Sequence, residues 1–320
     1  MREKLITVVM CTYNGERYLR KQLDSIITQT YKNIEVIIVD DCSTDNTYSI
    51  LEEYASKYAC VHIRQNKNNL GFNKNFEQAL PLANGEFIAI SDQDDIWYPE
   101  KLTKLYKRIG NKGLVFSNSE LIDENDQLTG KRLLYNAIEV DSLSYQSILI
   151  NNFVTGHTVL LKREFLKRAL PFPADGYYDW WLGFIAFYYN EITYLDEVLT
   201  AYRFHSDSVV QKDLFTFRGK SSHEVLSQYN STRIQLEQMK LHLKAKYNEL
   251  FLNKVLLLYK ERLTFFKKTQ LFLFIYSNHN VLFPLRKRKR LISRSRFKYV
   301  SNYLKEITLA KQNLMKYNLL

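Results

Sequence analysis

The chain has 320 residues, of which 46% are hydrophobic and 25% are charged. These proportions are typical of a folded globular protein and exclude a disordered or collagen-like chain. The formal net charge is +11, but residues 286–298 alone hold eight basic residues and no acidic one. The basic excess is therefore largely a local feature, and it says little about the fold.

Three cysteines, Cys11, Cys42 and Cys60, are odd in number and lack the spacing of a metal site. This usage favours a reducing cytoplasm. The apolar run near the N-terminus is too short for a signal peptide. A later apolar stretch, 271–285, is interrupted by polar residues before it reaches the roughly 18 residues of a membrane span. We therefore expect a cytoplasmic protein.

The first 120 residues alternate between apolar runs and amphipathic segments. Helices are expected between the runs, and strands are predicted at 5–10, 34–40, 61–64, 86–91 and 113–118. Near-continuous apolar strands that alternate with helices are typical of a parallel sheet that is covered on both faces. The sequence therefore predicts an α/β fold with a Rossmann-like, mostly parallel sheet.

The alternation loosens in the second half of the chain, which becomes helical towards its end. A heptad-like stretch at 225–247 predicts a long helix that could pair two copies of the chain. We expect a first domain at 1–215 and a helical, basic region at 216–320.

Polar clusters directly follow three of the predicted strands. They are Thr12-Tyr13-Asn14, Asp40-Asp41 and Asp92–Asp95. In open α/β sheets ligands bind at the carboxyl ends of the strands, so we expect these clusters on one rim. No Gly-rich dinucleotide-binding or phosphate-binding loop follows the first strand, which disfavours a dehydrogenase or a P-loop enzyme.

The segment SDQDDIW places Asp92, Asp94 and Asp95 between an apolar run and Trp97. Carboxylates this close repel one another, and the repulsion grows as water is excluded. One interpretation is a solvated turn that caps the next helix, which begins near Pro99. The other is a site for a hard divalent cation, because Mg²⁺ binds to one or two carboxylates together with phosphate oxygens.

Other candidate residues also have two interpretations each. Asp41 could cap a helix or accept the imide N–H of a pyrimidine base beside Tyr13. Asp179, in GYYDWWLG, could cap a helix or act as a general base whose pKa is raised by its aromatic neighbours. His157 and His205 lie near polar turns, where a lone histidine is more often structural than catalytic.

Taken together, these segments resemble the inverting glycosyltransferases of family 2, which have the nucleotide-sugar-binding fold called GT-A. The resemblance covers roughly residues 4–210 and is carried, in order, by VVMCTYNGERYL, VIIVDDCSTDNT, NNLGFNKNF, AISDQDDIWYPEKL, TGHTVLL, YYDWW and AYRFHSDS. The DQDD-W and DWW forms are most similar to the rhamnosyltransferase-like branch that builds bacterial surface polysaccharides.

The resemblance implies a role for each matching position. Those implied to contact the nucleotide are Thr12, Tyr13, Asn14, Asp41, Lys74 and Asp92. It implies a divalent cation, Mg²⁺ or Mn²⁺, at Asp92 and Asp94 with His205 near the diphosphate, and Asp179 as the base. Support or acceptor contacts are implied for Asp95, Trp97, Gly156, His157, Trp180 and Trp181. Two departures bear on the donor and acceptor, because many members have His where Tyr178 stands and Asn where Ser208 stands.

The implied reaction is a single displacement. A hydroxyl of a glycan or lipid-linked glycan attacks the anomeric carbon of a dTDP- or UDP-linked sugar, for which rhamnose is a candidate. Asp179 takes the proton while the nucleoside diphosphate leaves with the cation, so the anomeric centre inverts.

Two other functions share parts of this pattern. A sugar-nucleotide pyrophosphorylase would use the same type of sheet, but it should carry a Gly-rich, Arg-containing loop where this chain has CTYNGERY. An inactive carbohydrate- or membrane-binding relative would be expected to lose Asp92, Asp94 or Asp179, and all of them are present.

The basic segment 286–298 has three interpretations. It could be the solvated face of a terminal helix, a contact with the anionic inner face of the plasma membrane, or a nucleic-acid site. We do not expect nucleic acid, because no nucleic-acid-binding fold accompanies the charge. The neighbouring apolar stretch 271–285 favours the membrane if the acceptor is linked to a lipid.

Overall fold

A computed structural model of the protein describes residues 3–134, 139–204, 222–242, 249–260, 265–284, 296–305 and 307–308. The packing divides the chain into two compact units. The N-terminal unit comprises Met1–Ser142 and Phe153–His205, and the C-terminal unit comprises Leu143–Asn152 and Ser206–Leu320. The boundary predicted between residues 215 and 216 lies outside the described residues.

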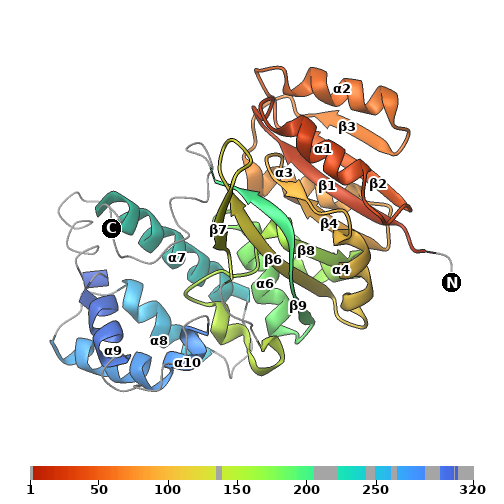
Figure 1. The fold of residues 1–320 in the computed structure, drawn as a ribbon. Helices are drawn as coiled ribbons and strands as arrows, with labels where there is room; N and C mark the ends of the chain where they lie inside the picture. Colours follow the sequence, from red (N-terminus) through yellow and green to blue (C-terminus); the bar gives the residue numbers. More distant parts are fainter. Residues whose placement is uncertain are drawn as a thin grey trace. The chain divides into compact units, whose positions relative to one another are not determined.

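A mixed sheet forms the centre of the N-terminal unit (Figure 1). Its strand order is β3-β2-β1-β4-β8-β6-β9-β5, and β7 pairs with β6 beside this path. The strands are β1 (Ile6–Thr12), β2 (Ile34–Asp40), β3 (Val61–Gln65), β4 (Phe87–Ser91), β5 (Ile96–Trp97), β6 (Leu114–Ile122), β7 (Leu128–Arg132), β8 (Val159–Lys162) and β9 (Ile192–Arg203).

The predicted parallel pairing holds for the strands nearest the N-terminus. β1 pairs in parallel with both β2 and β4, and β2 pairs in parallel with β3. Beyond β4 the sheet is mixed, because β8 inserts antiparallel between β4 and β6. The α/β fold is confirmed, but fewer strand pairs are parallel than expected. The apolar run of β8 predicts a strand, but it does not predict which strands β8 will pair with.

The helices of the N-terminal unit follow the predicted alternation. They are α1 (Leu19–Ile27), α2 (Thr47–Lys57), α3 (Phe72–Ala79), α4 (Lys101–Ile109), α5 (Leu166–Ala169) and α6 (Tyr178–Tyr188), with 3₁₀ turns at Leu80–Leu82, Val140–Ser142, Gly156–Thr158 and Arg163–Phe165. Pro99 precedes α4 and its N-cap Glu100 rather than standing in the first turn.

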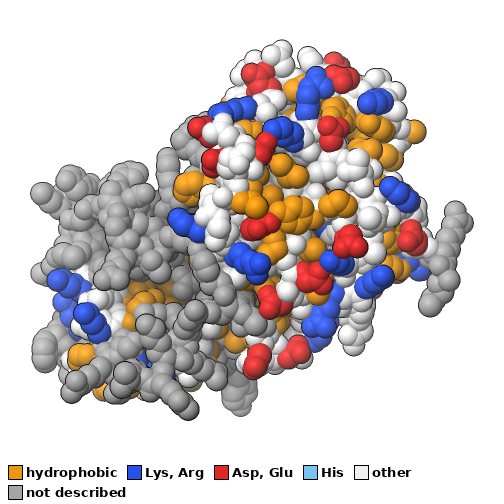
Figure 2. All heavy atoms as spheres, viewed as in Figure 1, with side chains coloured by type: hydrophobic (Ala, Val, Ile, Leu, Met, Phe, Trp, Pro, Cys, Tyr) orange, Lys and Arg blue, Asp and Glu red, His pale blue; other side chains and the backbone are white. Residues whose placement is uncertain are grey.

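Helices cover both faces of the sheet, as the apolar strands predicted. Alternate side chains of β1 (Ile6, Val8 and Met10) share one core with side chains from α1, α2 and α4. The helix α3 packs against β1 and β2, and the Asn75 side chain on it donates to the main-chain carbonyl of Val39, 2.9 Å away. Because both faces of the sheet are covered by helices, the strands are held in place and the polar loops lie at their carboxyl ends. Acidic and basic side chains are interspersed on the face of this unit that Figure 2 shows.

The described part of the C-terminal unit is mostly helical, as predicted, and its segment Leu143–Asn152 contains one 3₁₀ turn, at Tyr145–Ile148. Its helices are α7 (Ser222–His242), α8 (Glu249–Lys260), α9 (Phe265–Ser277) and α10 (His279–Leu282), and residues 296–305 are also helical. The hydroxyls of Tyr259 and Tyr303 lie 2.6 Å apart in its core. Of the basic segment 286–298, only residues 296–298 belong to the described part of the chain. Among the helices described, none has both the length and the apolar character needed to cross a bilayer.

Candidate active site

The loops after β1 and β4 are joined through Gln93, the second residue of the Asp92–Asp95 segment. The main-chain N–H of Tyr13 donates to Gln93 Oε1 at 2.8 Å, and Gln93 Nε2 donates back to the Tyr13 carbonyl at 3.0 Å. A Cβ at Gly15 would lie 2.4 Å from Gln93 Oε1, so a larger residue there would displace the Gln93 side chain from this position. The Tyr13 ring remains 46% exposed and free to contact a ligand. Sequence patterns had not singled out Gln93.

Thr12 and Asn14 make contacts between loops. Thr12 Oγ1 donates to Asp40 Oδ1 at 2.9 Å, at the ends of the paired strands β1 and β2. The Asn14 N–H donates to Ser43 Oγ at 2.9 Å, and Asn14 Oδ1 accepts from the Thr44 N–H at 2.8 Å. These side chains hold the loops after β1 and β2 together, which brings two of the three predicted clusters to one rim.

Asp41 organises the loop that precedes α3. Its buried carboxylate accepts hydrogen bonds from Asn66 Nδ2 at 2.7 Å, the Leu70 N–H at 2.9 Å and the Gly71 N–H at 2.8 Å. A carboxylate has about four lone-pair sites, so one further donor can still be accepted. The alternative interpretation of Asp41 as a helix cap is wrong, because the N-cap of α2 is Asn46.

Asn73, the second residue of α3, fastens the start of that helix to the start of α6. Asn73 Oδ1 accepts from the Tyr178 N–H at 2.9 Å, and Asn73 Nδ2 donates to the Gly176 carbonyl. Lys74, the neighbouring residue, is exposed and forms an ion pair with Glu77 at 2.5 Å. The fixed group of this segment is therefore Asn73, whereas Lys74 would have to leave Glu77 to contact a phosphate.

Asp179 is the half-buried second residue of α6. The N-cap of this helix is Tyr177, so Asp179 is not the cap. Its Oδ1 accepts from the Trp180 N–H at 2.6 Å and its Oδ2 accepts from the Gly156 N–H at 3.3 Å. Burial raises the pKa of Asp179 to about 7, and the negative charge of Asp92 acts in the same direction. A carboxyl group with this pKa can take up a proton near neutral pH.

The aromatic residues around Asp179 support the helix rather than line an open surface. Trp180 and Trp181 are both buried, and Trp181 Nε1 donates to the Ala169 carbonyl at 2.8 Å. Gly156 packs directly on Tyr178, because a Cβ at Gly156 would lie only 2.1 Å from the Tyr178 hydroxyl. The close approach explains why glycine is required in the turn that contacts Asp179.

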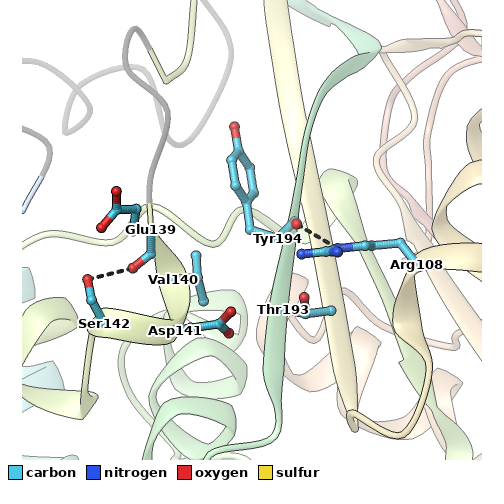
Figure 3. Close-up of a pocket in the computed structure, with 7 residues that line it drawn as sticks. All are labelled: Arg108, Glu139, Val140, Asp141, Ser142, Thr193 and Tyr194. Carbon is cyan, nitrogen blue, oxygen red and sulfur yellow. Dashed lines mark hydrogen bonds between the residues drawn. The ribbon is translucent and has the colours of Figure 1, made fainter.

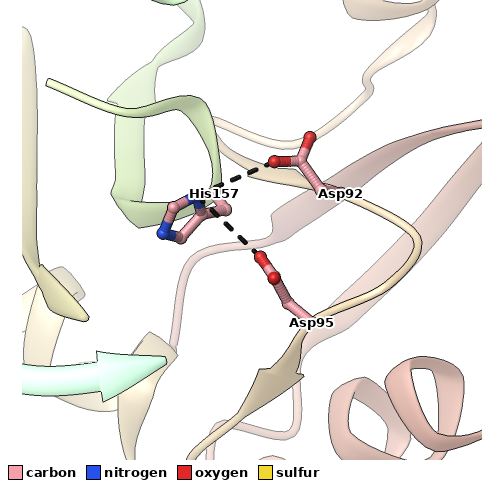
Figure 4. A group of neighbouring side chains, drawn as sticks. All are labelled: Asp92, Asp95 and His157. Atoms are coloured by element: carbon pink, nitrogen blue, oxygen red, sulfur yellow. Dashed lines mark ion pairs between the residues drawn. The ribbon is translucent and has the colours of Figure 1, made fainter. Parts of the chain in front are cut away.

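His157, the next residue of that turn, faces the acidic loop (Figure 4). Its Nδ1 lies 3.7 Å from Asp92 Oδ2 and 3.9 Å from Asp95 Oδ2. Its Nε2 lies 2.7 Å from Ser119 Oγ, and its ring stacks on Tyr202 with the ring centres 4.6 Å apart. His157 and Asp95 are fully buried, whereas Asp92 is partly exposed. The turn at Gly156–Thr158 therefore contacts both the acidic loop and Asp179.

Asp92, Asp95 and His157 fit a divalent cation. One ligand atom from each lies within 4.8 Å of the others. Asp95 Oδ2 is buried and has no hydrogen-bond partner, so it is available as a ligand. Burial raises the pKa of Asp95, as do Asp94 and Asp92, and burial lowers the pKa of His157. Carboxylate and neutral imidazole are suitable ligands for ions such as Mn²⁺.

Asp94, predicted as the stronger ligand, does not belong to this group of three. Its main-chain carbonyl accepts a hydrogen bond from Arg203 Nε at 2.7 Å. The N–H of Arg203 donates to Asp95 Oδ1 at 3.1 Å, and its Nη1 forms an ion pair with Asp126 at 2.6 Å. Buried Arg203 thus holds the acidic loop from the end of β9. His205, two residues further on, lies outside the described residues.

A cavity lies apart from these loops, at the start of β9 (Figure 3). It has a volume of about 540 Å³ and is lined by Arg108, Glu139, Val140, Asp141, Ser142, Thr193 and Tyr194. Arg108 Nε donates to the Tyr194 carbonyl at 2.9 Å. Thr193 and Tyr194 lie near the start of β9, whereas Arg203, which contacts the acidic loop, is its last residue, so the cavity and that loop are at opposite ends of the strand.

Known protein structures share this fold. S. aureus TarS 1-349 in complex with UDP-GlcNAc has a TM-score of 0.61 and 19% sequence identity, covering 98% of this chain and 92% of that one. The mannosyltransferase PcManGT from Pyrobaculum calidifontis, in complex with GDP-Man and Mn²⁺, has a TM-score of 0.53 and 17% identity over 97% of this chain and 86% of its own. These similarities support the GT-A-like fold.

Sequence relatives are found in several organisms. An uncharacterized glycosyltransferase of Haemophilus influenzae is 30% identical over 63% of this chain and 66% of its own length. An uncharacterized glycosyltransferase of Rickettsia felis is 28% identical over 65% of this chain and 35% of its own length, so the chain spans about a third of that relative. Residues 7–170, half of the chain, match the family described as Glycosyl transferase family 2. The chain therefore belongs to glycosyl transferase family 2.

Proposed function

We propose that the protein is an inverting glycosyltransferase that moves a sugar from a nucleoside-diphosphate sugar to a hydroxyl of a glycan or lipid-linked glycan. The observation that carries the proposal is that one turn contacts both Asp179 and the acidic loop. Gly156 donates to Asp179, whose pKa is raised to about 7, and His157 faces Asp92. A transferase needs a base beside a site for a diphosphate. Family membership supports the same class of reaction.

Asp179 is the proposed base. Its carboxylate accepts the proton of the acceptor hydroxyl as the hydroxyl oxygen bonds to the anomeric carbon. The bond from that carbon to the diphosphate oxygen breaks at the same time, and the nucleoside diphosphate departs with the electron pair. One displacement inverts the anomeric centre. The two N–H groups that Asp179 accepts from would keep its carboxylate oriented during the proton transfer.

The nucleotide is proposed to bind along the loops after β1 and β2. The exposed ring of Tyr13 can stack against the base, and the remaining acceptor position of Asp41 can take an imide N–H. Thr12 and Asn14 would act indirectly, because their polar groups already hold these loops. Lys74 would reach a phosphate only after leaving Glu77.

The acidic loop would hold a divalent cation, Mg²⁺ or Mn²⁺. Asp92 and Asp94 are the proposed ligands towards the diphosphate, with His205 near it, and Asp95 and His157 are more deeply buried than Asp92. When bound, the cation supplies positive charge that offsets the charge of the departing diphosphate. Asp92, Asp95 and His157 could instead form the inner ligand set, since their ligand atoms lie within 4.8 Å of one another.

For the donor and the acceptor we propose only chemical classes. A dTDP- or UDP-linked donor is favoured, and the branch resemblance makes rhamnose a candidate sugar and bacterial surface polysaccharide a candidate product. Structures of similar fold that contain UDP-GlcNAc or GDP-Man support a nucleotide-sugar donor. A cytoplasmic enzyme that binds an anionic membrane surface through residues 286–298 would suit a lipid-linked acceptor. A homodimer through the C-terminal helices is also proposed.

The proposed function is tested by measuring nucleoside diphosphate release from a panel of nucleotide sugars. The assay contains Mg²⁺ or Mn²⁺ and extracts that supply acceptors. We expect release from at least one donor, and loss of that release on chelation of the metal. Turnover of no donor under any of these conditions would contradict the proposal.

A further inference from the structure

Lys101 is a charged side chain in the core of the N-terminal unit. It is the first residue of α4 and is 0% exposed. Lysine is almost never fully buried unless its ammonium group is paired, because removing the charge from water is costly. An aliphatic side chain would fill the same space without this cost. The contacts of the ammonium group therefore indicate what Lys101 does.

The ammonium group joins three elements near the proposed site. Lys101 Nζ donates to the main-chain carbonyl of His157 at 2.5 Å and to Thr200 Oγ1 at 2.8 Å. It also lies 3.7 Å from the centre of the Trp97 ring, which presents its π face to the charge. Lys101 thus connects α4 with the turn at His157, with β9 through Thr200, and with β5 through Trp97.

These partners also fix the acidic loop. The two residues of β5, Ile96 and Trp97, pair with Ala201 and Thr200 of β9, immediately after the loop ends. The Trp97 N–H donates to Ser25 Oγ at 3.0 Å. Trp97 is 2% exposed, so it supports the loop from behind rather than forming a wall of the site.

The turn that Lys101 holds is the one that contacts Asp179. Within Gly156–Thr158, the N–H of Gly156 donates to Asp179 and the ring of His157 faces Asp92 and Asp95. Burial lowers the pKa of Lys101, whereas the carboxylates of Asp95 and Asp92 favour its charged form. The Lys101 amino group therefore lies where it can fix the turn.

We propose that Lys101 is a positioning residue, which holds the Gly156–His157 turn through the His157 carbonyl so that Asp179 and the acidic loop keep their relative orientation. This inference rests on the proposed function, in which Asp179 is the base. Because Lys101 is fully buried, we expect it to contact neither the donor nor the acceptor. Its removal should therefore reduce the chemical step more than it reduces donor binding.

The decisive variant is Lys101→Met, which keeps an unbranched, flexible side chain and removes the terminal amino group. We expect kcat to fall roughly 10- to 100-fold, as for a misplacement of about 1 Å, with donor KM changed less than about threefold. Lys101→Arg, which retains a cation, should recover part of the loss. The matched control is Lys104→Met, one turn later on α4, where the side chain forms surface ion pairs with Glu100 and Glu197. A folded Lys101→Met enzyme with unchanged kcat would overturn the proposal.

A second readout does not depend on turnover. Amide hydrogen exchange at Gly156 should be faster in Lys101→Met than in the wild type and in Lys104→Met, because the turn is no longer held. Unchanged protection of Gly156 would contradict the proposal even if no donor were turned over, which separates its failure from that of the proposed function. If Lys101→Met does not fold, Lys101→Gln decides, since it keeps a polar group in the core but is neutral and one atom shorter than lysine, which weakens the contact with the His157 carbonyl. Increased exchange at Gly156 would support the proposal, and unchanged exchange would overturn it.

Discussion

The main-chain N–H of Gly156 donates a hydrogen bond to Oδ2 of Asp179, 3.3 Å away. The next residue of the same turn, His157, faces Asp92 and Asp95. One short turn thus lies between the proposed base and the acidic loop. Asp92 contributes to the raised pKa of Asp179, so the two sides also interact electrostatically.

Asp179→Asn should abolish transfer. The amide cannot accept the proton of the acceptor hydroxyl, and loss of a general base typically costs about 10²- to 10⁴-fold in rate. Donor binding, measured by calorimetry, should change little. The control is Asp175→Asn, an exposed aspartate in the loop before α6, which should retain activity. Full activity in Asp179→Asn would exclude its role as base.

The rate should rise with pH through about 7, the pKa of Asp179. Below this pKa the carboxyl group is protonated and cannot act as a base, so kcat should fall about tenfold per pH unit. The profile is measured with saturating donor and acceptor at constant metal concentration. A flat profile across this range would show that the raised pKa of Asp179 does not control the reaction.

Stability should depend on the same ionisation. Because the pKa of Asp179 is raised in the folded protein, this group favours the fold below its unfolded pKa of about 3.9. That contribution is lost progressively as the pH rises to about 7. Asp179→Asn should therefore gain stability relative to the wild type between these values, which thermal unfolding at several pH values measures. A difference in melting temperature that is independent of pH would argue against the raised pKa.

Asp94→Asn should weaken metal-dependent nucleotide binding, whereas Asp179→Asn should not. The carboxylate of Asp94 is the proposed ligand, but its main-chain contact with Arg203 survives the change, so the loop should remain folded. Calorimetric titration with a nucleoside diphosphate, with and without Mn²⁺, measures the effect. If the two variants bind nucleotide in the presence of Mn²⁺ equally well, Asp94 is not a ligand.

Gly156→Ala should impair catalysis through a steric effect. The new methyl group would lie 2.1 Å from the Tyr178 hydroxyl, so the turn or the start of α6 must shift. We expect kcat to fall at least about tenfold. Adding Tyr178→Phe, which removes that hydroxyl, should restore part of the activity. Wild-type kcat in Gly156→Ala would mean that the geometry of this turn is unimportant for the reaction.

Much of the fold could be predicted because it depends on local patterns. The strand at Ile34–Asp40 was predicted with these bounds, since an apolar run ends there in polar turn residues. Motif matches also pointed to Asp179 at the start of a helix. Strand order was harder to predict, because the position of β8 between β4 and β6 depends on contacts between distant segments.

The supporting residues of the site could not be predicted from spacing. Lys101 and Arg203 are charged residues that a sequence pattern assigns to the surface, yet both are buried. Their partners lie far away in the chain, as with Lys101 and His157. Asp95 likewise was predicted as an accessory residue, and its burial beneath Asp92 becomes evident only from the tertiary structure.

The central claim is that the acidic loop and Asp179 serve one donor-binding site. The most direct test is a crystal structure with a nucleoside diphosphate and Mn²⁺, in which anomalous scattering locates the metal. We predict Mn²⁺ bound to carboxylates of the Asp92–Asp95 segment, with the diphosphate between the metal and Asp179. A metal and diphosphate bound elsewhere, with Asp179 facing away from them, would contradict the account.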